Sequence, residues 1–83
     1  MINDDDIVFN LRSQDLSHHG DPSSLQPLKQ ALWVLNVTKK QMQIRALSAK
    51  AISKILSAVH EIDLSEETIV KAFARAGKKI KRY

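Results

Sequence analysis

Two similar stretches in the second half of the chain decide the expected fold: LSAKAISKIL (residues 47–56) and LSEETIVKAF (residues 64–73). Each has a leucine, then a serine, and then apolar residues at helical spacing. A serine hydroxyl before a first turn accepts a hydrogen bond from a backbone N–H, and the leucine before it can form a hydrophobic staple. The two stretches therefore predict helices that begin after Ser48 and Ser65.

A looser copy of this cap pattern occurs at Thr38 and Gln41, which fit a capping box. It predicts a short helix at about residues 39–46. A continuous helix through Ser48 is the alternative, because no glycine or proline intervenes. We favour a break at Ser48, since a continuous helix would place polar residues on the apolar side of the next helix.

The other expected helices follow from apolar periodicity. The first should begin near Ser24 and end at residues 36–38, with Pro27 tolerated in its first turn. The third is expected at residues 49–61 and the fourth at residues 66–81. The fold class is therefore all-α, a small bundle of about four helices. The apolar stripe of the first helix consists of Leu25, Leu28, Leu32 and Leu35.

Charge divides the chain into two parts. Residues 1–24 contain five aspartates and one arginine, whereas residues 25–83 carry a net charge of +8. The first part lacks helical periodicity, and its apolar run Ile7–Leu11 could form a strand only if it found a partner. We expect an acidic, mostly disordered arm at 1–24 and a helical domain at 25–83. Ordering of the arm against another chain or against the basic surface is the alternative.

Several classes of protein find no support in the sequence. No apolar run approaches the roughly 20 residues of a membrane span, and no secretory signal precedes the body, so a cytoplasmic protein is expected. No phosphate-binding loop, zinc-protease motif or nucleophile elbow is present, so no enzyme activity and no cofactor are expected. His18 and His19 are neighbours that should point apart, and His60 is distant, so no metal site is expected.

A stripe of basic residues runs along one side of the fourth predicted helix. Lys71, Arg75, Lys78 and Arg82 are spaced to lie on one side, about 200° from the apolar seam that contains Ile69. Such a stripe is either a solvated face near a helix C-terminus or a phosphate-binding face. Gly77 within this helix marks either close packing or a boundary beyond which the basic tail frays.

The stretch LSAKAISKIL (47–56) resembles the first helix of the helix-turn-helix motif in response-regulator-type transcription factors. SEETIVK (65–71) resembles the start of their recognition helix. The connection between them, residues 57–64, is longer than the turn of that family and lacks its usual glycine. A second register, in which Ser48 opens the recognition helix, also matches in part.

The resemblance implies a small DNA-binding transcriptional regulator with its fourth helix in the major groove and its basic tail on backbone phosphates. A helical adaptor that binds a protein through its apolar stripes is the alternative, followed by a basic helix on a membrane surface. A homodimer is also expected, because Ile69, Phe73, Ile80 and Tyr83 offer more apolar surface than one neighbouring helix would cover. The expected DNA contacts are Lys50, Lys54, Thr68, Lys71, Arg75, Lys78, Lys79, Lys81 and Arg82.

Overall fold

The computed structural model describes residues 3–44 and 46–80 as an assembly of helices and connecting segments. This confirms the predicted all-α class. Two 3₁₀ turns, η1 (Ser17–His19) and η2 (Pro22–Ser24), lie between the first two α-helices. The α-helices are α1 (Asp4–Arg12), α2 (Pro27–Met42), α3 (Ala49–His60) and α4 (Glu66–Arg75).

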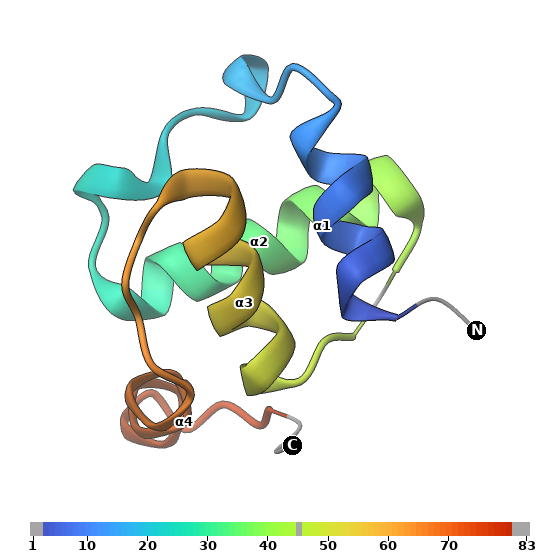
Figure 1. Ribbon diagram of the computed structural model, residues 1–83. Helices are drawn as coiled ribbons and strands as arrows, with labels where there is room; N and C mark the ends of the chain where they lie inside the picture. The colour runs from blue at the N-terminus through green and yellow to red at the C-terminus, as the bar shows by residue number, and fades with distance from the viewer. Residues whose placement is uncertain (1–2, 45, 81–83) are drawn as a thin grey trace.

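Helix α3 lies at the centre of the fold and contacts α1, α2 and α4 (Figure 1). Its side chains Ile52, Ile55 and Leu56 are completely buried. The predicted break before α3 is confirmed, because the Ser48 hydroxyl accepts a hydrogen bond from the backbone N–H of Ala51 at 3.1 Å. The core that surrounds α3 also includes Val34 from α2 and Ile69 from α4.

The N-terminal segment is folded, so the expectation of a disordered arm is wrong for residues 3–24, and the apolar run at residues 7–11 is helical. Asn3 caps α1 by accepting a hydrogen bond from the backbone N–H of Asp6 at 2.9 Å. Ile7 and Leu11 are one helical turn apart and are buried in the shared core, where α1 packs against α3. The three aspartates of the first turn favour this helix electrostatically, since they lie at the positive end of its dipole.

Helix α2 is longer than predicted and starts later. It begins at Pro27 and continues to Met42, so the expected break at residues 36–38 and the separate helix at 39–46 are wrong. Thr38 does not cap a new helix. It is buried inside α2, where its hydroxyl donates to the carbonyl oxygens of Val34 and Leu35. A threonine satisfied in this way does not interrupt a helix.

Helix α4 is shorter than predicted, because it ends at Arg75 and not near residue 81. Gly77 has a φ of +70°, and the following N–H of Lys78 donates to the carbonyl of Phe73 at 2.9 Å, which together form a Schellman motif. A Cβ at Gly77 would meet no atom within 4 Å. Of the two interpretations of this glycine, the structure therefore supports a helix boundary and not close packing.

Aromatic contacts hold the segment between α1 and α2 in place. The indole N–H of Trp33 donates to the carbonyl oxygen of His19 at 3.0 Å, and the indole and the ring of His60 lie nearly perpendicular with their centroids 4.6 Å apart. The His18 and His19 rings lie 4.0 Å apart, so the expectation that they point apart is wrong. The tight η1 turn brings them together, because it lacks the regular extended or α-helical geometry that separates neighbours.

Two helices end in a left-handed residue that is not glycine, and this suggests a stabilising substitution. Glu61 has a φ of +57° after α3 and is exposed. A residue with a Cβ is strained there, so Glu61→Gly should raise the free energy of unfolding by about 0.5–1 kcal/mol. Urea denaturation measures this change. Glu61→Ala is the control, because it removes the charge and keeps the Cβ; equal stabilisation by both would refute the backbone explanation.

The stability of the fold should depend on pH, because α3 ends in a partly buried histidine, His60. Burial lowers the pKa of His60, against an opposing effect of Asp21, and the His60 Nε2 is buried without a hydrogen-bond partner among the described residues. Folding therefore favours neutral His60, so its contribution to stability is full above the ordinary pKa of 6.5 and is lost as the pH falls through the lowered value. We expect Tm to fall between about pH 7.5 and about pH 5.5.

The variant His60→Leu should show a smaller fall of Tm across this interval, because position 60 no longer titrates. Ser57→Ala is the control, because Ser57 is an exposed residue of the same helix that does not titrate, and it should keep the fall of the unaltered chain. Thermal unfolding followed by circular dichroism at both pH values measures the difference. An unchanged fall in His60→Leu would contradict the assignment.

Candidate nucleic-acid interface

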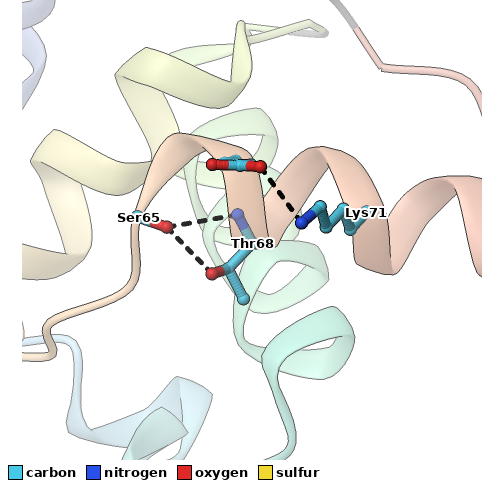
Figure 2. Close-up of polar contacts among 4 residues, drawn as sticks. Ser65, Thr68 and Lys71 are labelled. Carbon is cyan, nitrogen blue, oxygen red and sulfur yellow. Dashed lines mark hydrogen bonds and ion pairs between the residues drawn. The ribbon is translucent and has the colours of Figure 1, made fainter.

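The start of α4 is fixed by a serine cap, as the sequence predicts. The Ser65 hydroxyl accepts a hydrogen bond from the backbone N–H of Thr68 at 3.2 Å, and the two hydroxyl oxygens lie 2.8 Å apart (Figure 2). Glu66 and Glu67 occupy the first turn, where the helix dipole favours negative charge. The side chain of Thr68 is therefore held at a defined place on the surface near the beginning of the helix.

One face of α4 is buried and the other is open. Ile69 and Phe73 enter the core, with exposures of 0% and 2%, whereas Thr68, Lys71 and Arg75 are exposed. The burial of Ile69 and Phe73 removes two of the four residues that were expected to form a homodimer surface; Ile80 is partly buried, and Tyr83 lies outside the described residues. The open face displays a hydroxyl and two cations within two turns of one helix, which is a combination suited to phosphates and polar base edges.

A surface hollow of about 430 Å³ adjoins this open face. Three of the predicted contacts, Thr68, Lys71 and Arg75, line it together with Ala72. The opposite wall comes from the beginning of α2 and consists of Gln26, Pro27 and Leu28. This wall could not be predicted from the pattern around α4, because it comes from a segment about forty positions earlier in the chain.

Lys71 has an ion-pair partner on its own helix. Its Nζ lies 3.0 Å from Oε1 of Glu67, one turn earlier, and both side chains are largely exposed (Figure 2). An exposed pair of this kind contributes only about 0.3–0.5 kcal/mol, so Lys71 can leave Glu67 for a phosphate at little cost. Glu67 was not among the predicted contacts, although its position four residues before Lys71 was visible in the sequence.

The basic tail follows α4 but does not extend its helical stripe. Lys78 and Lys79 are exposed and lie beyond the Schellman turn at Gly77. The predicted regular spacing from Arg75 to Lys78 therefore does not hold, because the helix has already ended. Lys81 and Arg82, the remaining predicted contacts of the tail, lie outside the described residues.

The two predicted contacts on α3 lie apart from the hollow. Lys50 is exposed on the outer side of α3. Lys54 is directed to α1, where its Nζ lies 2.6 Å from Oδ1 of Asp5. The hydrogen bond with the Asp5 carboxylate raises the pKa of Lys54 and keeps this lysine positively charged. The structure therefore brings three of the predicted residues together at α4 and places Lys54 in a contact between helices.

Comparisons with known proteins found no relative of this chain. No protein-family model, no curated protein and no solved structure matches the chain. Within residues 3–44 and 46–80, no helix has the length and apolar character needed to cross a bilayer. The same residues contain no group of three or more histidine, cysteine, aspartate or glutamate side chains that could hold a metal ion.

The serine cap of α4 gives a stability prediction. Ser65→Ala should lower the free energy of unfolding by about 1 kcal/mol, because the Thr68 N–H loses its acceptor. Thr68→Val is the matched control, since it removes the contact between the two hydroxyls and leaves the cap bond intact. Urea unfolding should show the larger loss in Ser65→Ala. A larger loss in Thr68→Val would mean that the hydroxyl pair, and not the cap, fixes the start of α4.

Proposed function

We propose that this protein binds double-stranded DNA through the open face of α4, as a small helix-turn-helix-like regulator. The observation that carries the proposal is the hollow at α4, where Thr68, Lys71 and Arg75 lie together on a helix whose opposite face is fixed in the core. A rigid helix that presents cations and a hydroxyl is suited to enter a major groove.

The proposed division of work follows from the chemistry of the side chains. Arg75 and Lys71 neutralise backbone phosphates, and this neutralisation releases counterions from the DNA. Thr68 and Glu67 lie near the beginning of α4, where their oxygens can hydrogen-bond to base edges; a carboxylate accepts from the amino group of cytosine. Lys78 and Lys79 follow α4 in the chain and add positive charge that strengthens attraction without selecting a sequence.

The arrangement of α3 and α4 supports this proposal. The two helices contact each other and are joined by the short segment at residues 61–65. In Figure 1, α4 is seen nearly end-on while α3 runs across the view, so the helices cross steeply. Steep crossing of two joined helices is typical of helix-turn-helix motifs, although this connection is longer than their usual turn of three or four residues.

The alternative of an adaptor that binds through its apolar stripes has less support. On α3, such a stripe would consist of Ile52, Ile55 and Leu56. These three side chains are fully buried. A partner could not reach them without unfolding the domain. Partner binding through apolar residues would therefore need another surface, such as the predicted leucine stripe, of which Leu25 is 39% exposed and Leu28, Leu32 and Leu35 are partly buried.

A binding assay with matched variants tests the DNA proposal. Fluorescence anisotropy with a random-sequence duplex should show binding that weakens steeply with salt, because the contacts are ionic. Lys71→Gln and Arg75→Gln should each weaken binding and reduce the slope of log K against log salt by about 0.9, since each removes one phosphate contact.

Lys39→Gln is the control, because Lys39 is an exposed lysine near the other end of α2 from the wall of the hollow. It should leave the slope nearly unchanged. Equal losses in Lys39→Gln and Lys71→Gln would show that net charge alone drives binding. Binding that is absent at low salt, in a chain shown to be folded by circular dichroism, would refute the proposal.

A further inference from the structure

The outer side of α1 carries the most exposed large apolar side chain among the described residues. Phe9 is 76% exposed, and the next such side chain, Leu25, is 39% exposed. Phe9 borders a surface hollow of about 450 Å³ whose other walls are Asp5, Val8, Arg12 and Ser13. This surface, called the α1 patch below, is distinct from the hollow at α4.

The geometry of α1 explains why the patch faces outward. Ile7 and Leu11 are buried in the core, so the opposite side of the helix is directed to solvent. Phe9 lies about 200° around the helix from Ile7, because each residue turns the helix by about 100°. With a smaller polar residue at this position, α1 would fold equally well. Folding of the described chain therefore does not account for an aromatic side chain at position 9.

The charges of the α1 patch are arranged symmetrically about its centre. Asp5 lies at one end of the patch and Arg12 at the other, and the midpoint between them falls between Val8 and Phe9. If two α1 helices pack antiparallel around a twofold axis at this midpoint, Asp5 of each copy faces Arg12 of the other. The same operation sets Phe9 of each copy against Val8 of the other. The surface is thus complementary to itself, as a twofold interface requires.

We propose that the α1 patch is a homodimer interface in which two copies of this chain pack their α1 helices antiparallel, with Phe9 at the centre and two Asp5–Arg12 pairs at the ends. The described chain already uses Asp5 for Lys54, and a carboxylate has enough acceptor sites to serve both cations. No ion pair of Arg12 is found within the described residues.

The dimer is weak and leaves the DNA-binding face free. A contact through one nine-residue helix buries less than the roughly 1,200 Å² typical of stable complexes, so association at micromolar or higher concentration is expected. Helix α1 and helix α4 lie on different sides of α3, so pairing through α1 does not cover α4 (Figure 1). The inference does not rest on the proposed function, and it stands or fails separately from DNA binding.

Sedimentation of the full chain over a range of concentrations tests the interface. Weight-average mass should rise from monomer toward dimer as concentration increases. Phe9→Ala should raise the dimer Kd by about tenfold or more, because it removes the central anchor from both copies. Leu25→Ala is the matched control, since Leu25 is also exposed but lies outside the patch, and it should leave the Kd unchanged.

A charge exchange tests the pairing itself and is best made in a Lys54→Gln background, which avoids repulsion at position 54. Asp5→Lys places like charges at both ends of the patch, and Arg12→Asp does the same with the opposite sign, so each variant alone should remain monomeric. A mixture of the two restores opposite charges at both ends and should form a heterodimer. Native mass spectrometry distinguishes it if one variant carries a mass tag.

The results separate the proposal from its competitors. Dimers in the mixture but not in either variant alone would establish the antiparallel register. A folded chain that stays monomeric at high micromolar concentration would overturn the proposal. Dimers that survive Phe9→Ala and both charge variants would overturn it as well, because they would place the interface on another surface.

Discussion

Burial of α3 by three other helices is the constraint on which the rest of the structure depends. Ile52, Ile55 and Leu56 leave no exposed surface, and burial of such side chains stabilises a fold by about 1.5–3 kcal/mol each. A chain of 83 residues without cysteine has no disulfide to replace this contribution. Helices α1, α2 and α4 are therefore positioned by the need to cover α3, and the surface left open on each follows from that need.

The same constraint explains why the acidic N-terminal segment is folded. Three aspartates on a flexible arm could compete for the cations of the body, but α1 instead supplies Ile7 and Leu11 to the core beside α3. Among the residues that the structure describes, Asp5 alone of the three pairs with a cation of the body, through its contact with Lys54. The acidic charge of this segment thus serves mainly at the N-terminus of α1, where it favours the helix dipole, and among the described residues it forms no ion pair with the cations of α4.

The two proposed binding surfaces lie on α1 and α4, and these two helices are packed in the same way. Each of α1 and α4 buries one side against α3 and presents unlike chemistry on the other: an aromatic patch with one charge at each end on α1, and a hydroxyl with two cations on α4. Because α3 separates them, the proposed dimer contact would not block the proposed DNA contact. A dimer of small DNA-binding domains gains affinity from two half-sites, which offsets the small area that each domain offers alone.

The sequence by itself determined the all-α class and the starts of α3 and α4, whereas it left the role of Gly77 open and placed the end of α4 too late. The two helix starts depend on hydrogen bonds between residues a few positions apart, those of Ser48 and Ser65 with the next turn. Local chemistry of this kind is visible in a linear pattern. The exposed positions of Thr68, Lys71 and Arg75 on one side of α4 follow from the same helical periodicity.

Only the tertiary structure decided the features that depend on contacts between distant segments. The helix at α1 was missed although Asn3 caps its start locally, because its core residues Ile7 and Leu11 become favourable only when α3 covers them. The continuation of α2 through Thr38 depends on burial of that residue, and the wall of the hollow at Gln26 comes from a distant segment. Lys54 was expected on a DNA-binding surface, but the packing of α1 on α3 brings Asp5 to it. A linear pattern carries no information on which helix lies beside which, and that choice is made by burial of apolar area over the whole chain.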